Sequence, residues 1–214
     1  MEQTIKNIIF DFGGVLLDID YQRTYDSLSR LLNVTFEPDL LPDDAKKVLF
    51  DYETGHIHTE SFIWNIQRWN KSNTTPMPDE IISGWNAMLI GWNPDKFAFL
   101  EELKEKYTLY LLSNTNELHL NWVYNDLRYN HNIIDFDHRF FTKTYYSHLI
   151  GMRKPNKDIF NFVGQDARLH PSETLFIDDI KANVEGGNSA GWHTYHHDPT
   201  EDLINICRNK LKLL

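Results

Sequence analysis

Acidic and hydroxyl side chains follow short apolar runs at three places in this chain. Asp11 comes directly after the apolar run 8–10 and is followed, one residue later, by two glycines. Ser113 follows the apolar stretch 107–112, and the pair Asp178-Asp179 follows 175–177. Such runs are typical of buried strands, and open α/β sheets bind their ligands at the carboxyl ends of strands. These side chains are therefore candidates for one site that handles a charged ligand.

The pair Asp178-Asp179 predicts a metal ion. Adjacent carboxylates repel each other, so a buried strand that ends in both is unfavourable unless a cation offsets their charge. Mg²⁺ is the simplest such cation, because hard divalent ions prefer oxygen ligands. Capping of the following helix by Asp179 is the alternative, and it explains only one of the two carboxylates.

Ser113 and Lys154 are candidates for contacts to an anion. Ser113 opens the turn 113–116, which can offer a hydroxyl and backbone N–H groups. The same turn can cap the next helix, and the two roles are compatible. Lys154 is followed by Pro155 just before an apolar helical pattern, which indicates a positioned cation. The alternative is a solvated basic turn.

Helical and strand patterns indicate how these side chains are positioned. Apolar residues recur at helical spacing between residues 18 and 92, as at Tyr25, Leu28 and Leu32, and a further helix follows Asn93-Pro94. Strands and helices then alternate, with strands expected at 8–10, 107–112, 139–142, 174–177 and 192–195. This order predicts an α/β fold, a doubly wound parallel sheet with a helical cap inserted after the first strand. The insertion would cover the carboxyl ends of the strands.

The composition limits the classes of partner. With 214 residues, 41% of them hydrophobic, and a net charge of −10, the chain is expected to fold as a globule that binds no nucleic acid. Its one cysteine, Cys207, allows no disulfide within the chain and is expected to pack in a helix. The sequence contains neither a signal h-region nor a run of membrane-spanning length, so we expect a cytoplasmic protein without a membrane partner. His193, His196 and His197 cluster near the last strand, where we expect solvated or capping side chains rather than metal ligands.

The order of these motifs resembles that of the haloacid dehalogenase superfamily over the whole chain. Asp11, Ser113, Lys154 and the pair Asp178-Asp179 correspond to its four motifs. The resemblance implies a Rossmann-like core formed by residues 1–17 and 93–214, with a helical cap at 18–92. More narrowly, the strings Phe-Asp-Phe-Gly-Gly-Val, Leu-Ser-Asn-Thr-Asn, Gly-Met-Arg-Lys-Pro and Phe-Ile-Asp-Asp are similar to the bacterial branch that contains the α-D-glucose-1-phosphate phosphatase.

The resemblance implies a Mg²⁺-dependent phosphatase that acts on a small phosphorylated metabolite, such as the sugar phosphate glucose 1-phosphate. Asp11 would attack the phosphorus, and water would then hydrolyse the aspartyl-phosphate. The implied ligands of Mg²⁺ are Asp11, Asp178 and the backbone carbonyl of Gly13, with Asp179 ligating directly or through water. The implied phosphate contacts are Ser113, Lys154 and the amides of Phe12, Gly13 and Asn114.

Gly13 departs from the superfamily pattern. Most phosphatases of the superfamily carry a second aspartate at this position, which protonates the leaving oxygen and later activates water. Three explanations stay open: an acid from elsewhere, a leaving group that needs less help, such as an anomeric oxygen, or slow or absent catalysis. The candidates for the acid, and for contacts that set substrate specificity, are Asp18, Asp20, Glu53 and His56.

Three other functions are alternatives to a phosphatase. A haloacid dehalogenase also uses the first aspartate as nucleophile but needs no metal, which leaves Asp178-Asp179 unexplained. A phospho-acceptor receiver domain has its acidic pair before the acceptor aspartate, whereas here the pair comes last. A non-catalytic phosphate-binding module is supported by Gly13 alone.

Overall fold

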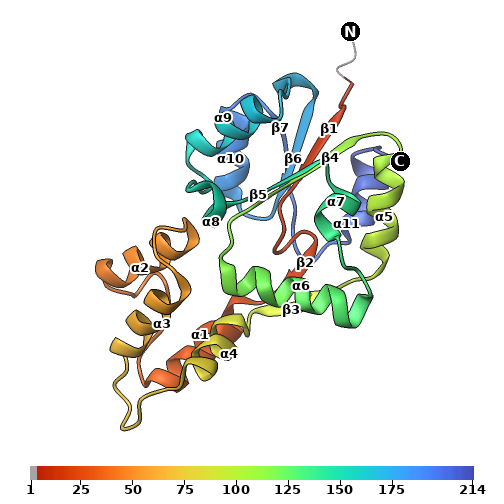
Figure 1. The fold of residues 1–214 in the computed structure, drawn as a ribbon. Helices are drawn as coiled ribbons and strands as arrows, with labels where there is room; N and C mark the ends of the chain where they lie inside the picture. The colour runs from red at the N-terminus through yellow and green to blue at the C-terminus, as the bar shows by residue number, and fades with distance from the viewer. Residues whose placement is uncertain (1–3) are drawn as a thin grey trace.

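The core of the protein is a five-stranded parallel sheet in a computed structural model that describes residues 4–214 (Figure 1). The strand order is β5-β4-β1-β6-β7, with β1 in the centre. The strands are β1 (Asn7–Phe10), β4 (Thr108–Ser113), β5 (Lys143–Tyr146), β6 (Thr174–Asp178) and β7 (His193–His196). The predicted fold class, an α/β sheet with a helical insertion after the first strand, is confirmed.

Helices cover both faces of the sheet because the strand residues alternate between two apolar clusters. Ile8 and Phe10 belong to one cluster and Ile9 to the other. The first face carries α5 (Asp95–Lys104), α6 (Glu117–His131), α7 (Phe136–Phe140) and α11 (Leu203–Asn205), which continues into η2 (Ile206–Lys210). The second face carries α9 (Lys157–Asp166) and α10 (Lys181–Ser189). Two short helical segments, α8 (Ser147–Ile150) and η1 (Pro171–Glu173), lie in the connections.

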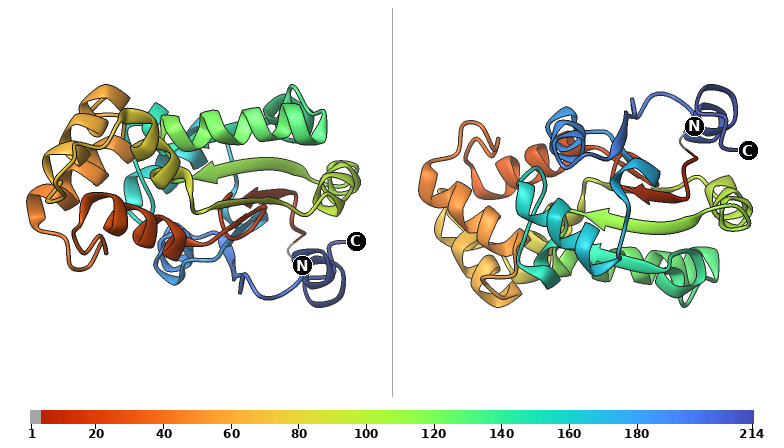
Figure 2. Two further views of the ribbon diagram at one scale, coloured as in Figure 1. Left: turned by 90° about the horizontal axis from the view of Figure 1, so that it is seen from below. Right: turned by 90° about the horizontal axis from the view of Figure 1, so that it is seen from above.

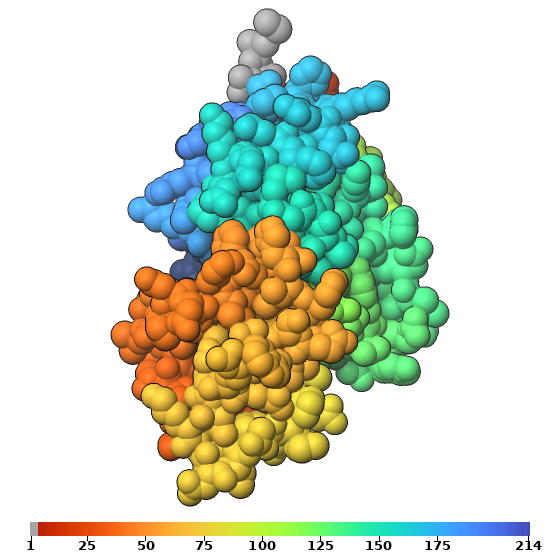
Figure 3. All heavy atoms as spheres, turned by 60° about the vertical axis from the view of Figure 1, so that its left-hand side comes forward, coloured from red at the N-terminus to blue at the C-terminus, as the bar shows by residue number. Residues whose placement is uncertain are grey.

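The insertion after β1 is a small helical bundle with its own core. It contains α1 (Tyr21–Leu32), α2 (Asp43–Glu53), α3 (Thr59–Arg68) and α4 (Pro78–Asn86). Its apolar interior includes Leu28, Phe36, Phe62 and Trp85, all buried. The strand arrows of Figure 2 point toward this bundle, and in the space-filling view of Figure 3 its orange and yellow side chains form a lobe against the core. The bundle therefore lies over the carboxyl ends of the strands.

Two strands that the sequence did not predict join the bundle to the core. β2 (Leu17–Ile19) and β3 (Leu89–Trp92) pair antiparallel. They form a stem where the chain enters and leaves the bundle. The insertion, which was expected to be helical, therefore also contains two short strands. The boundaries 1–17, 18–92 and 93–214 stay a prediction.

The strand expected at 139–142 is misplaced. Helix α7 ends at Phe140 and the strand, β5, begins at Lys143. Phe136 and Phe140 are both buried in the core at helical spacing, and this packing prevails over the β-propensity of the aromatic residues. Cys207 is buried in a helical turn, as expected. In residues 4–214 no helix has the length and apolarity that a membrane span requires.

Candidate active site

Three carboxylates meet where β1 and β6 end. Asp11 follows β1 directly, Asp178 is the last residue of β6, and the two strands are paired in the sheet. A carboxylate oxygen from each of Asp11, Asp178 and Asp179 lies within 4.8 Å of the other two. Parallel pairing thus brings together side chains that are far apart in the sequence.

Lys154 supplies a buried cation to this cluster. Its Nζ lies 2.8 Å from Oδ1 of Asp11 and 2.6 Å from Oδ2 of Asp178, and it donates to the carbonyl of Leu112 at 2.8 Å. The lysine side chain is fully buried. Asn114 holds the lysine backbone from both sides, since its amide donates to the Lys154 carbonyl and accepts from the Lys154 N–H, each at 2.9 Å. The loop is a fixed support rather than a solvated turn.

The charges of the cluster are out of balance. Burial and the neighbouring Asp178 raise the pKa of Asp11 well above its usual range, although Lys154 opposes this shift. Burial and Asp178 also raise the pKa of Asp179 to about 6. Burial would lower the pKa of Lys154, but the two ion-paired carboxylates raise it. One ammonium group faces three carboxylates, and a divalent cation would restore neutrality.

The residues present fit such a cation. Oδ1 of Asp179 is buried and has no hydrogen-bond partner, so a lone pair is free for a metal. Asp178 is oriented by the Ile180 N–H at 2.8 Å and by the Asn183 amide at 3.0 Å. Gly14 makes room for the cluster, because a Cβ there would lie 2.3 Å from Oδ2 of Asp179.

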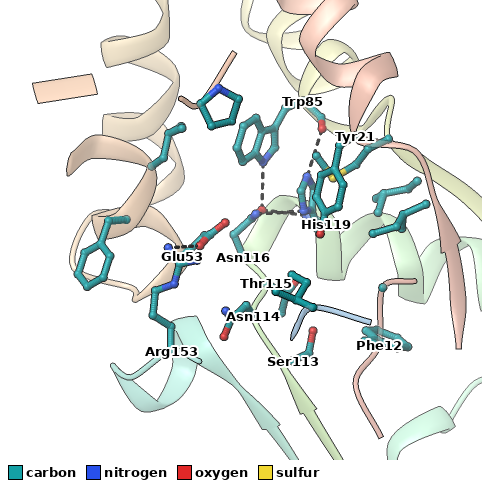
Figure 4. Close-up of a pocket in the computed structure, with 18 of the residues that line it drawn as sticks. Phe12, Tyr21, Glu53, Trp85, Ser113, Asn114, Thr115, Asn116, His119 and Arg153 are labelled. Atoms are coloured by element: carbon teal, nitrogen blue, oxygen red, sulfur yellow. Dashed lines mark hydrogen bonds and ion pairs between the residues drawn. The ribbon is translucent and has the colours of Figure 1, made fainter. Parts of the chain in front are cut away.

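A cavity of about 510 Å³ opens beside the cluster, between the core and the bundle (Figure 4). Phe12, Gly13, Ser113 and Asn114 line its core side. Residues of the bundle and its stem line much of the rest, mainly with apolar and aromatic side chains, and further core residues contribute polar side chains. This size is typical of a pocket for a small metabolite.

Only one of the four residues proposed as a replacement acid lines the cavity. Glu53 does so, and burial raises its pKa above the usual range although the neighbouring Arg153 opposes this shift. Asp18 instead pairs with Lys96 at 3.0 Å, away from the cavity.

The other two candidates, Asp20 and His56, also lie outside the lining of the cavity. Asp20 caps helix α1 by accepting the Gln22 N–H. His56 is exposed and bonds to the Thr54 hydroxyl at 2.6 Å. Neither side chain lines the cavity, because each is held by a local contact in the bundle.

The structure adds cavity residues that the sequence analysis did not select: Tyr21, Trp85, Asn116, His119 and Arg153. His119 stacks on Trp85 with ring centroids 5.1 Å apart and contacts its carbonyl through Nε2 at 3.2 Å. Burial lowers the pKa of His119 to about 4, so the ring is neutral at pH 7. In the sequence, the spacing of Asn116 and His119 at the start of a helix is the signal that could have identified these two residues.

His196 contacts the backbone of the acidic cluster and is not one of its carboxylate or metal-ligand groups. Its ring Nε2 lies 2.8 Å from the carbonyl of Asp179 and is placed to donate to it. Neither His193 nor His197 joins the acidic group. His193 and His196 are exposed and contact backbone carbonyls, whereas His197 is buried, contrary to the solvated or capping role expected of it.

Comparison with known proteins places this geometry in a family. Residues 5–191 match the sequence profile of the haloacid dehalogenase-like hydrolases. The chain belongs to this family. A haloacid dehalogenase-like enzyme of Bacteroides thetaiotaomicron has 31% sequence identity and a TM-score of 0.86, over 96% of this chain and 100% of that one. A structure of the same enzyme in complex with magnesium and inorganic phosphate has 30% identity and a TM-score of 0.79, over 92% of this chain and 96% of that one.

A curated relative narrows the activity. The D-ribitol-5-phosphate phosphatase of Bacteroides thetaiotaomicron is 28% identical over 204 residues, which is 92% of this chain and 94% of that protein. By homology this hydrolase is therefore a phosphatase of the family, with Mg²⁺ as its cofactor at the acidic cluster. The expected likeness to the glucose-1-phosphate phosphatase branch is corrected, because this named relative acts on the phosphate of an open-chain polyol.

Proposed function

We propose that this hydrolase removes phosphate from a small phosphorylated polyol or sugar through Asp11. The observation that carries the proposal is the buried Lys154 ion-paired to both Asp11 and Asp178, at the edge of a metabolite-sized cavity. The relative that acts on D-ribitol 5-phosphate supports the substrate class.

Asp11 is the proposed nucleophile. Its Oδ1 accepts the Phe12 N–H at 2.6 Å and pairs with Lys154, so Oδ2 is the oxygen we expect to attack the phosphorus. The bond from phosphorus to the substrate oxygen breaks, and the aspartyl-phosphate forms. Water then cleaves this acyl phosphate, which returns the Asp11 carboxylate and releases inorganic phosphate. Fixed positions and fixed charge are what phosphoryl transfer requires.

The remaining residues are proposed to hold the phosphate and the metal. Ser113 and the amides of Phe12, Gly13 and Asn114 are the candidates for the phosphate oxygens, together with Lys154. Asp11, Asp178, Asp179 and the Gly13 carbonyl are the candidates for the ligands of Mg²⁺. When bound, Mg²⁺ neutralises charge on the phosphate oxygens and on the carboxylates.

The proton for the leaving oxygen is proposed to come from water in the cavity. Gly13 has no carboxyl group, and a side chain there would meet Ile19, whose Cδ1 lies 2.9 Å from the position of a Cβ. Glu53 lines the cavity, but its carboxylate is paired with Arg153 at 2.8 Å. The ion pair favours the ionised carboxylate, which accepts hydrogen bonds from hydroxyls and has no proton to donate.

The test is phosphate release from D-ribitol 5-phosphate, sugar 5- and 6-phosphates and glucose 1-phosphate. Each is assayed with Mg²⁺ and with EDTA, for the wild type and for Asp11→Asn. We expect release that requires both Mg²⁺ and Asp11, with polyol or sugar phosphates of open chain as the best substrates. Release that persists in Asp11→Asn would exclude this nucleophile. No release by the wild type, together with halide release from 2-haloacids, would favour a dehalogenase instead.

A further inference from the structure

An ion pair crosses the cavity from the bundle to the core. Glu53 at the end of α2 lies with its Oε2 2.8 Å from a guanidinium nitrogen of Arg153 (Figure 4). Both residues line the cavity, and their side chains are only 26% and 30% exposed. Arg153 directly precedes Lys154, so one partner stands next to the catalytic cation and the other is in the bundle.

The neighbouring contacts hold this pair in place. The Ser147 hydroxyl donates to the backbone carbonyl of Glu53 at 2.6 Å. At Gly55 the bundle presses so closely on the core that a Cβ would lie 2.1 Å from the carbonyl oxygen of His148. The Arg153 guanidinium also lies over the ring of Phe50, 5.6 Å from its centroid. The pair is therefore preorganised, unlike a flexible surface ion pair.

Glu53 cancels the charge that Arg153 would otherwise present to a ligand. The other charged side chains that line the cavity are Asp39 and Lys46, which are exposed and contact each other through the Asp39 carbonyl at 3.2 Å. The half-buried cation of the cavity is thus Arg153, and its counter-ion is part of the protein. A free guanidinium at this place would be a site for a second anionic group, because arginine binds carboxylates and phosphates in a bidentate manner.

We propose that the Glu53–Arg153 pair is a charge filter that admits phosphorylated substrates with an uncharged, hydroxylated tail and rejects those with an anionic tail. This inference rests on the proposed phosphatase function and specifies its substrate class. Oε2 of Glu53 is buried against Arg153, and a carboxylate has further lone pairs with which it can accept a hydrogen bond from a substrate hydroxyl. A tail carboxylate would meet Glu53 as a like charge and could reach Arg153 only by displacing it.

Two probes that differ only at the tail test the filter. D-Glucitol 6-phosphate ends in a neutral CH₂OH group, and 6-phospho-D-gluconate carries a carboxylate at the same carbon. The measured quantity is the ratio of kcat/KM for the polyol to kcat/KM for the acid, with Mg²⁺. The variants are Glu53→Gln, which keeps the shape but removes the negative charge, and Arg153→Met, which removes the cation. Asp44→Asn is the matched control, because it removes the same charge from an exposed position of the same helix.

We expect the wild type to prefer the polyol and Glu53→Gln to lower the ratio by about tenfold or more, because Arg153 becomes available to the carboxylate. Arg153→Met is expected to keep or raise the ratio, and Asp44→Asn to leave it at the wild-type value. Thermal melting checks that each variant is folded, and the opposite sign of the Arg153→Met effect keeps the test valid if Glu53→Gln is unstable. A Glu53→Gln ratio equal to that of the wild type, or a fall in Arg153→Met, would overturn the filter. Failure of the wild type to hydrolyse either probe or D-ribitol 5-phosphate would overturn the proposed function itself.

Discussion

Gly14 is the position where a single methyl group is expected to disturb the metal site most directly. Its φ of +76° is in the left-handed region, and a Cβ would lie 2.3 Å from Oδ2 and 2.6 Å from Cγ of Asp179. Contacts below 3.0 Å force a movement, so Gly14→Ala must displace the Asp179 carboxylate or the loop after β1. Gly151 provides a matched control, because its φ is +70° and a Cβ there would meet nothing within 4 Å.

The two substitutions separate backbone strain from the clash. An alanine in the left-handed region costs about 1 kcal/mol, so both variants are expected to lose about this much free energy of unfolding in urea. Gly14→Ala adds displacement of a carboxylate that we expect to serve the metal. Changes in groups that orient metal ligands reduce metal affinity by roughly 10- to 100-fold. We therefore expect the Mg²⁺ concentration for half-maximal activity to rise by this factor in Gly14→Ala and to stay unchanged in Gly151→Ala.

The assay is phosphate release at saturating substrate over a Mg²⁺ titration, with urea unfolding measured in EDTA. Equal Mg²⁺ requirements in wild type and Gly14→Ala would refute the argument that the clash at Asp179 controls metal binding. An equal rise in Gly151→Ala would show that the effect is general strain rather than the contact with Asp179.

Three further predictions concern the buried charges and the base of α6. Lys154→Met leaves Asp11 and Asp178 without their cation and is expected to lower the free energy of unfolding in EDTA by about 3–5 kcal/mol. Urea unfolding with and without Mg²⁺ checks this, and we expect Mg²⁺ to restore part of the lost stability. Because the pKa of Asp179 is raised to about 6 in the folded protein, protons compete with Mg²⁺ below that pH. The Mg²⁺ affinity measured by calorimetry should therefore fall as the pH drops from 7 to 5. The free energy of unfolding of the metal-free protein should rise over the same range, because the folded state binds more protons than the unfolded state. A flat profile would contradict the shift. Asn116→Ala removes the cap of α6 and the partner of the Trp85 indole, with an expected loss of about 1–2 kcal/mol in urea unfolding.

Local sequence signals were sufficient for the fold class and for most elements of the core. The apolar runs before Asp11 and Asp178 became paired central strands, because only buried strands of a sheet covered on both faces tolerate such runs. Propensity failed at 139–142, where burial of Phe136 and Phe140 in the core decided for a helix. The stem strands β2 and β3 were also missed, since each is short and gains its partner only across the whole insertion.

For the candidate site, the sequence by itself determined which charged and polar side chains lie at the ends of strands or in the adjoining loops. Asp11, Ser113, Lys154 and the pair Asp178-Asp179 were selected from residue type and local pattern, and their proposed roles stay predictions. Only the tertiary structure decided which groups meet: it left Oδ1 of Asp179 without a hydrogen bond, put Lys154 between two carboxylates, and paired Glu53 with Arg153. The physical reason is that strand pairing and the docking of the bundle set distances of a few ångströms between residues that are distant in the sequence, and local periodicity carries no information on such distances.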